Sequence, residues 1–278
     1  MQESSSTSVL HFLTWLKHEG KSSNTISTYH QEIKKFEHWL EANEKKLMNI
    51  SQNEVQDYII FLEQQGKSPI TTDKILGVIR TFAKYLKKPD ISFDIEIKQG
   101  SKKDEFEVLS QIECEQLLTE VKEHENKRNI AIVYMLLHTG IRVSELCGLN
   151  KSDLEFERSK VKITSANGEE RIIPLSEEVK SHLEGYLEAT QNNEALFVSK
   201  SNERLTERSV QYMLKKYNVN AQKLRHTFCQ QLIDKGVSLE VVSKLAGHRD
   251  INVTKKYAKG RIQTEAFEDA IRRTFSGN

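Results

Sequence analysis

The segment His138-Thr-Gly-Ile-Arg-Val-Ser-Glu-Leu146 marks the end of one helix and the start of another. It follows the longest apolar stretch of the chain, Ile130 to Leu137, which predicts a buried helix. Gly140 is expected to end that helix, because glycine adopts the left-handed conformation common at helix C-termini. Arg142 then lies where the chain enters a new helix, and Glu145 is close enough to hold its guanidinium group in place.

Two later segments also place polar side chains at or beside helix ends and apolar stripes. In QKLRH (residues 222 to 226), the glutamine and the arginine are three positions apart and share a helix face beside an apolar stripe. In GHRDINVTKKY (residues 247 to 257), Gly247 predicts the end of a short helix, which leaves His248 at its C-terminal edge. Tyr257 follows nine positions after His248. Cationic and phenolic side chains therefore mark successive helix ends.

The composition favours a helical protein with two domains. The chain has 278 residues, which is long for one domain, and 37% hydrophobic with 29% charged residues is typical of globular proteins. Only 3 prolines and 12 glycines interrupt it, so helices should dominate. The net charge of +1 gives no indication of a binding partner, and only the distribution of charge is informative.

The cysteines and the N-terminus indicate a soluble cytoplasmic protein. Cys114, Cys147 and Cys229 are far apart, without the spacing of a disulfide framework or a zinc site, so we expect three buried thiols and no metal. The first ten residues lack the charged and apolar regions of a signal peptide. The longest apolar stretch is too short to cross a bilayer, so no membrane partner is expected.

The N-terminal part predicts four amphipathic helices. Apolar residues recur at helical spacing in each, and Ser51 with Glu54 forms the sequence signature of a capping box at the start of the third. The four helices are expected near residues 8–17, after Ser23 or Asn24, from Ser51, and from about Pro69 to Lys87. We assign residues 1–88 to this helical domain.

The chain from residue 89 to residue 104 contains Pro89, Gly100 and a polar cluster, and predicts a linker. Residues 105–278 then form the second domain. Its clearest feature is a hairpin from Lys160 to Leu175 with an Asn-Gly turn, and a further strand is expected at Ala195 to Val198. The predicted fold class is mainly α, with a small antiparallel β-sheet in the second domain.

Basic residues gather on the fourth predicted helix, where Asp73 is the only acidic residue. A row of basic residues along one helix face, here called the basic ridge, is usually an ordinary solvated surface. It becomes a candidate for DNA phosphate contacts only when the motifs of the second domain are considered as well. The candidate DNA-binding residues are Lys74, Arg80, Lys84, Lys87 and Lys88.

The motifs TGIRVSEL, LRH and LAGH, followed by a tyrosine, resemble in this order the tyrosine recombinase or phage integrase family. The similarity extends over nearly the whole chain and is strongest to Xer-type enzymes and small transposon resolvases of the TnpI type. The pattern Ser-x-x-Thr-Ile-x-x-Tyr at residues 22–29 resembles the family's helical core-binding domain. The resemblance implies a C-shaped clamp around double-stranded DNA, a dimer at each site and a tetramer in the synapse, with no metal, ATP or other cofactor.

The resemblance also implies roles for individual residues. Arg142 and Arg225 would clamp the non-bridging oxygens of the scissile phosphate, since guanidinium groups are planar and permanently charged. Tyr257 would be the nucleophile that forms a 3′-phosphotyrosyl intermediate. His248 would hydrogen-bond the phosphate or assist proton transfer. His226 is expected to be a buried, hydrogen-bonded structural histidine.

The sequence departs from the family pattern at two positions. Gln222 occupies the place of a histidine, and glutamine can donate a hydrogen bond but cannot exchange a proton. Ala166 occupies the place of the hairpin lysine that serves as general acid. We hypothesise that Lys162, on the polar face of the same strand, replaces it, with Lys160, Arg171 or water as the other candidates.

Several alternatives remain open at this level. The chain could be a DNA-binding accessory protein that has lost catalysis, or a type IB topoisomerase, whereas a metal-dependent nuclease would need a carboxylate cluster that the sequence lacks. The task could be integration, excision, chromosome dimer resolution or cointegrate resolution, and the compact length favours the last. A predicted C-terminal helix after Arg261 would pack either on its own domain or on a neighbouring subunit.

Overall fold

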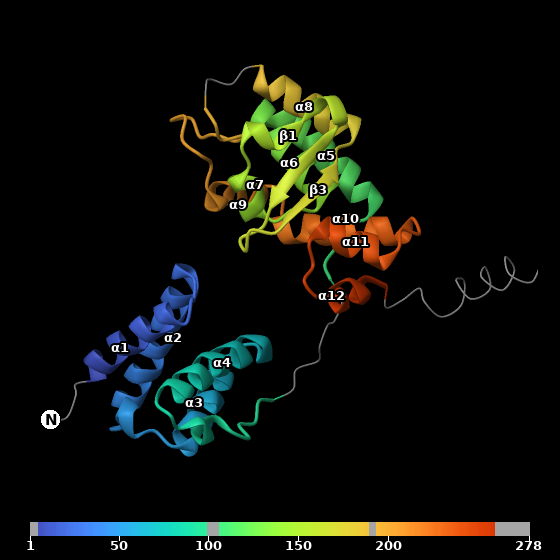
Figure 1. Ribbon diagram of the computed structural model, residues 1–278. Helices are drawn as coiled ribbons and strands as arrows, with labels where there is room; N and C mark the ends of the chain where they lie inside the picture. The colour runs from blue at the N-terminus through green and yellow to red at the C-terminus, as the bar shows by residue number, and fades with distance from the viewer. Residues whose placement is uncertain (1–4, 99–105, 189–192, 259–278) are drawn as a thin grey trace, which may run out of the picture. The chain divides into compact units, whose positions relative to one another are not determined.

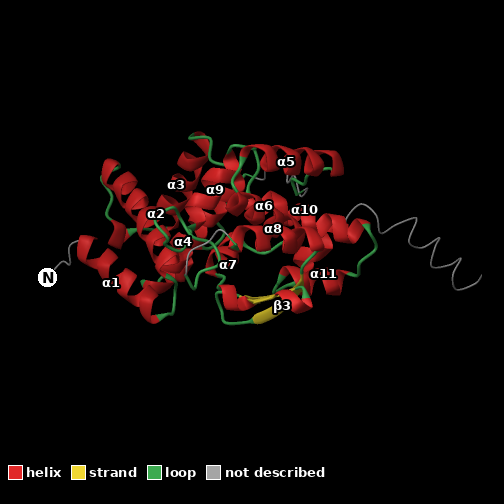
Figure 2. Cartoon of the chain, turned by 90° about the horizontal axis from the view of Figure 1, so that it is seen from above, coloured by secondary structure: helices red, strands yellow, loops and turns green. Residues whose placement is uncertain are grey.

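The computed structural model describes residues 5–98, 106–188 and 193–258. The chain divides into two compact units, Met1–Lys102 and Lys103–Asn278, which are described separately. Helices dominate both units, and the few strands lie in the second (Figure 2). The predicted fold class is therefore confirmed. The predicted C-terminal helix after Arg261 lies outside the described residues.

The described part of the first unit, residues 5–98, forms four α-helices (Figure 1). Three of them begin at serine caps, and the capping box of Ser51 and Glu54 is present as predicted. Phe12, Phe36 and Phe82 are fully buried at the centre of its core. The helices are α1 (Ser5–His18), α2 (Ser23–Ala42), α3 (Gln52–Gln64) and α4 (Pro69–Tyr85), with short 3-10 helices η1 (Leu47–Asn49) and η2 (Pro89–Ser92).

Helix α4 ends at Tyr85, two residues earlier than the prediction. Lys87 has a φ of 58°, in the left-handed region, so the chain turns away from the helix axis there. Arg80 and Lys84 lie one turn apart on the exposed face of α4, whereas Lys87 and Lys88 lie in the turn that follows. The predicted ridge is thus partly helical and partly a turn.

The first residues of the predicted linker pack against the first unit. The helix η2 contacts both α3 and α4, and Ile95 is buried in the same core. Gln56 pairs with the backbone of Glu96 in both directions, since its amide donates to the carbonyl (3.1 Å) and accepts from the N–H (2.9 Å). The apolar residues among the polar ones of this segment explain why it packs rather than extends.

The second unit is built around α6, most of whose side chains are buried. Helices α5, α8, α9 and α10 all contact α6, while α11 packs against α10 and α12 packs against α11 near the chain's described end (Figure 1). The helices are α5 (Gln111–His124), α6 (Lys127–Thr139), α7 (Val143–Gly148), α8 (Glu177–Leu187), α9 (Glu207–Lys215), α10 (Ala221–Asp234), α11 (Leu239–Ala246) and α12 (Ile251–Lys255), with 3-10 helices η3 (Lys151–Asp153), η4 (Phe156–Arg158) and η5 (Lys256–Ala258).

A three-stranded antiparallel sheet runs in the order β1 (Leu154–Glu155), β2 (Lys160–Thr164) and β3 (Glu170–Pro174). The predicted hairpin is confirmed, with Gly168 at a φ of 83° in its turn. The strand predicted at residues 195–198 is wrong, because only isolated bridges form there. The two-residue strand β1 was not predicted, since so short a segment has no detectable alternation.

Two glycines shape the turns that lead into the candidate site. Gly140 caps α6 with a φ of 62°, and Gly247 caps α11 with a φ of 66°. A side chain at Gly140 would collide with the ring of Phe228, and one at Gly247 would press against the guanidinium group of Arg171. Glycine is therefore required at both positions for conformation and for space.

The three cysteines are buried and unpaired. Within residues 5–98, 106–188 and 193–258, no helix combines the length and the apolar character that a membrane crossing needs. In those same ranges, no three His, Cys, Asp or Glu side chains gather as they would around a metal ion.

Candidate active site

Glu145 organises two arginines at the start of α7. It is only 7% exposed and accepts a hydrogen bond from the backbone N–H of Arg142 (2.8 Å) and one from its guanidinium group (3.2 Å). Arg171, on β3, adds two parallel bonds of 2.9 and 2.7 Å to the same carboxylate. Glu145 thus contacts Arg142 as predicted. Arg171 was a missed partner, because sequence spacing gave no sign that β3 passes beside α7.

The charge of Glu145 is maintained despite its burial. Burial acts to raise the pKa of this carboxyl, but the hydrogen bonds from Arg171 and from the backbone of Arg142, with the two guanidinium charges, bring the pKa below its ordinary value. Glu145 is therefore ionised near neutral pH and fixes both arginines. The bidentate geometry of Arg171 also fixes its orientation.

Arg225, on α10, is a buried cation with a spare donor. It is 3% exposed, and its Nη1 donates to the carbonyl of Gly140. Its Nη2 is buried and has no hydrogen-bond partner among the described residues. Burial and the nearby charge of Arg142 lower the pKa of Arg225 to about 10, so it stays protonated at neutral pH. A buried, charged donor without an acceptor destabilises the fold unless an anion accepts its hydrogen bond.

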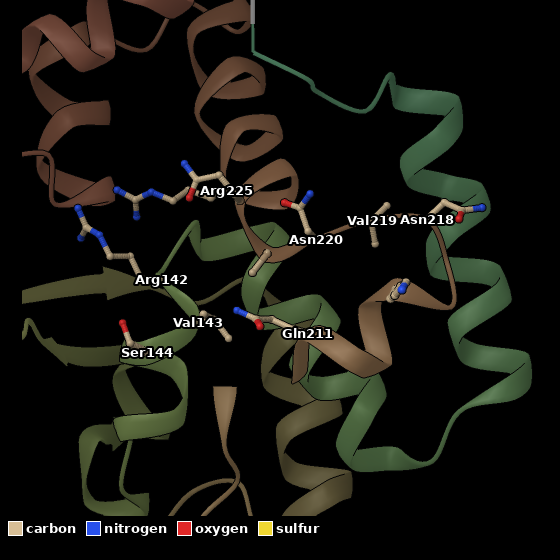
Figure 3. Close-up of a pocket in the computed structure, with 11 residues that line it drawn as sticks. Arg142, Val143, Ser144, Gln211, Asn218, Val219, Asn220 and Arg225 are labelled. Carbon is tan, nitrogen blue, oxygen red and sulfur yellow. The ribbon is translucent and has the colours of Figure 1, made fainter. Parts of the chain in front are cut away.

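Arg142 and Arg225 line the same open cavity of about 680 Å³. Figure 3 shows their guanidinium groups on one side of it, while Gln211 and Asn220 lie on the other. Gln222 also lines this cavity. The structure therefore brings together three of the residues that the sequence placed at the phosphate: Arg142, Arg225 and Gln222.

His248 follows the glycine cap of α11 and is tied to the arginines through the backbone. Arg142 donates to the carbonyl of Gly247 (3.0 Å), and Arg171 donates to the carbonyl of Leu245 (2.9 Å). The Nδ1 of His248 pairs with the hydroxyl of Thr254 (2.8 Å). Burial and the charges of Arg225 and Arg142 lower the pKa of His248 to about 4. Its ring is therefore neutral at physiological pH.

Tyr257 lies in η5 and is 6% exposed. Its hydroxyl contacts Nδ1 of His226 at 2.5 Å, and its ring stacks on Phe106 with 4.4 Å between centroids. The His248 ring is parallel to it within 7°, with centroids 6.3 Å apart. Burial raises the pKa of the phenol well above its ordinary value. Tyr257 adjoins His248 and is not among the residues that line the cavity.

The contact between His226 and Tyr257 was missed by sequence reasoning. His226 is half-buried rather than buried, and its Nε2 lies 3.0 Å from the amide nitrogen of Gln222. Phe106 stacks on its ring with 4.1 Å between centroids. The four-residue spacing of Gln222 and His226 was a usable signal for their pairing. The contact with Tyr257 is long-range, so no local pattern indicated it.

Lys162 lies apart from this group. It donates to Glu170 on the neighbouring strand (3.2 Å), its side chain is 43% exposed, and it does not line the cavity of Arg142. The candidate DNA-binding residues of the first unit are all exposed: Lys74, Arg80, Lys84, Lys87 and Lys88. Arg80 makes only a loose ion pair with Asp73 (3.9 Å).

Two arginines, a histidine and a tyrosine on this α+β unit, which follows a helical unit, define the class of a tyrosine recombinase. Residues 107–263 match the phage integrase family, and residues 9–89 match the phage integrase N-terminal SAM-like domain. The chain belongs to this family and is a tyrosine-type site-specific recombinase. The family predicted from the sequence is confirmed.

Known Xer proteins are similar over most of the chain. Tyrosine recombinase XerD of Oceanobacillus iheyensis is 31% identical, over 86% of this chain and 88% of its own length. Tyrosine recombinase XerC of Staphylococcus epidermidis is 30% identical, over 88% of this chain and 90% of its own. The fold is similar to the Tn1549 transposon integrase, solved with a circular intermediate DNA, with a TM-score of 0.78 at 18% identity over 95% of this chain and 99% of that one.

Proposed function

We propose that Arg142, Arg225, His248 and Tyr257 form the strand-cleavage centre of this recombinase. The observation that carries the proposal is the unsatisfied Nη2 of Arg225, which is buried beside Arg142 in a cavity open to solvent. A phosphodiester oxygen is an anionic acceptor that would satisfy this donor. Without such a ligand, burying the charge would only destabilise the fold.

The chemistry then follows from the residue types. The Tyr257 oxygen attacks the phosphorus and displaces the 5′ oxygen, which leaves a 3′-phosphotyrosyl ester. Arg142 and Arg225 hold the non-bridging oxygens where negative charge develops, and Glu145 positions Arg142. His248, neutral at physiological pH, hydrogen-bonds the phosphate. One ester replaces another, so the reaction needs no ATP and can be reversed.

Gln222 and Lys162 complete the proposed site. Gln222 lines the cavity, where its amide can donate to a phosphate oxygen. Lys162 is our candidate for the general acid that Ala166 cannot provide, and it would have to leave Glu170 to act. Cleavage of a nicked substrate by Lys162→Ala and, separately, by Lys160→Ala, the other lysine candidate, tests whether a displaced lysine supplies the proton. Wild-type cleavage rates in both variants would contradict that idea.

The proposed partner is a double-stranded DNA recombination site. The exposed side chains of Arg80 and Lys84 would contact phosphates along the duplex, together with Lys74, Lys87 and Lys88. We propose that the protein acts in the cytoplasm, as a dimer at each site and a tetramer in the synapse. We further propose a task in resolution, integration or excision of a mobile element.

A trapping experiment tests the proposal. Duplexes selected by binding from a random library provide the target, and a nick beside the scissile phosphate lets the leaving fragment diffuse away. With EDTA present, the wild-type protein is expected to form a covalent DNA adduct, and Tyr257→Phe should bind the same DNA without forming one. Tyr212→Phe, an exposed tyrosine on α9, is the matched control. Adducts formed by Tyr257→Phe would contradict the assignment.

A further inference from the structure

The hydroxyl of Tyr257 already has a partner that could take its proton. The Nδ1 atom of His226 lies 2.5 Å from that hydroxyl. Phe106 stacks on both rings, so the pair is held together and screened from solvent on that side. The buried thiol of Cys229 also contacts the hydroxyl, but a thiol is only a weak acceptor.

We infer that His226 is a catalytic residue of the cleavage reaction and accepts the proton of Tyr257 as the phenol oxygen attacks the phosphorus. This inference rests on the proposed function of Tyr257. The proton acceptor would then be the residue that directly follows Arg225 on α10. The proton acceptor and one of the two arginines that hold the phosphate would therefore occupy adjacent positions of one helix.

Electrostatics around His226 favour this role once DNA is bound. Burial and the charge of Arg225 lower the pKa of His226 to about 4, so the ring is neutral and has a lone pair at physiological pH. A phosphodiester in the cavity places negative charge beside Arg225, which offsets the repulsion that an imidazolium would experience. His226 thus becomes a stronger base when the substrate is in place.

Gln222 is suited to hold the ring during the transfer. Its amide faces Nε2 of His226, and half a turn about its last torsion presents Oε1 instead of Nε2. With Oε1 facing it, the ring carries its proton on Nε2 and points the lone pair of Nδ1 at Tyr257. The same oxygen continues to accept from Nε2–H after Nδ1 is protonated. Gln222 cannot exchange a proton, but it can position a residue that does.

The hydroxyl proton of Tyr257 moves to Nδ1 of His226 while an oxygen lone pair forms the bond to phosphorus. The bond from phosphorus to the 5′ oxygen breaks, and the leaving oxygen takes a proton from water or from a separate acid. In religation the imidazolium returns its proton to the departing phenol.

Single-turnover cleavage of two nicked duplexes tests the inference. One has the natural 5′ oxygen at the scissile bond, and the other has a 5′ sulfur, which leaves without protonation. His226→Ala is expected to slow cleavage of both about 100-fold or more, in the range of general-base catalysis. Added imidazole should restore part of the loss. His182→Ala, a half-buried histidine on α8, should cleave at the wild-type rate.

The possible results separate the roles of His226. If the sulfur substrate restores cleavage by His226→Ala, His226 acts as an acid for the leaving group. If His226→Ala cleaves faster than the wild-type protein, His226 only restrains Tyr257. Either result would overturn the inference. Gln222→Ala should reduce the cleavage rate less than His226→Ala does. Gln222→His should restore the rate, because a second imidazole can also pair with Nε2 of His226. DNA binding and thermal unfolding confirm that each variant is folded. If the proposed function itself fails, the wild-type protein forms no adduct.

Discussion

The role proposed for Arg225 accounts for a side chain whose surroundings in the protein alone are unfavourable. Its guanidinium group is buried, repelled by Arg142 and short of one hydrogen-bond acceptor. An apolar side chain of similar size at this position would avoid the cost of burying a charge with an unsatisfied hydrogen-bond donor. Function and stability are therefore expected to oppose each other at this position.

We predict that Arg225→Met unfolds at the same temperature as the wild-type protein or at a higher one, while cleavage falls by about 100-fold or more. Millimolar sulfate or phosphate should raise the melting temperature of the wild-type protein more than that of the variant, because these anions can occupy the cavity. Differential scanning calorimetry with and without each anion measures both effects. An Arg225→Met protein that melts well below the wild type would indicate a structural arginine.

Glu145 is the opposite case, a buried charge with all its partners. Removing one member of a buried charge pair costs roughly 3–5 kcal/mol, so Glu145→Gln should be strongly destabilised in urea unfolding at neutral pH. The pKa of Glu145 is lowered in the fold, so its contribution is fully present above the ordinary carboxylate pKa and lost as the pH falls through the folded value. The difference between wild type and variant should therefore shrink on acidification.

Glu178→Gln, an exposed glutamate on α8, provides the matched comparison for that series. It is expected to unfold within about 0.5 kcal/mol of the wild-type protein at neutral pH. A Glu145→Gln protein as stable as Glu178→Gln would mean that the arginines are held by other contacts.

At the scale of elements, the turn between α6 and α7 is where the site is most constrained. Gly140→Ala would force a side chain into the ring of Phe228 at a backbone conformation that alanine avoids. We expect it to lose about 2 kcal/mol or more of unfolding free energy, and to lose cleavage as Arg142 shifts. Gly185→Ala, in α8 with open space around it, should be neutral or slightly stabilising. Chemical denaturation of both variants compares them, and equal stability would contradict the geometry.

The elements that the sequence predicted well are those with local signals. The capping box at Ser51, the glycine cap at residue 140 and the hairpin all depend on residues a few positions apart. The end of α4 was predicted two residues late, because the turn after Tyr85 contains no glycine or proline until residue 89.

The features that were missed depend on long-range packing. Residues 195–198 have the composition of a strand, but their neighbours offer only isolated bridges. Arg171 reaches Glu145 across 26 positions, and His226 reaches Tyr257 across 31. The residue types of the site were readable from motifs, whereas these pairings needed the fold.

At the scale of the whole molecule, binding to DNA should depend on salt through the exposed cations of the first unit. Each phosphate contact contributes about 0.9 to the slope of log affinity against log salt concentration. The double variant Arg80→Ala, Lys84→Ala is therefore expected to reduce that slope by roughly 2. Lys45→Ala, which removes an exposed cation paired with Glu54, should leave it nearly unchanged. Fluorescence anisotropy across a salt series measures the slope for each variant. If the double variant has the same slope as the wild-type protein, Arg80 and Lys84 do not contact DNA phosphates.

The central claim concerns one covalent bond, and peptide mapping of the trapped adduct tests it most directly. The adduct formed on nicked DNA is digested with nuclease and protease, and tandem mass spectrometry locates the nucleotide. We predict a single modified peptide that spans Thr254 to Ala258, with the nucleotide joined through its 3′ phosphate to Tyr257. A nucleotide on any other residue, or joined through its 5′ phosphate, would contradict the account.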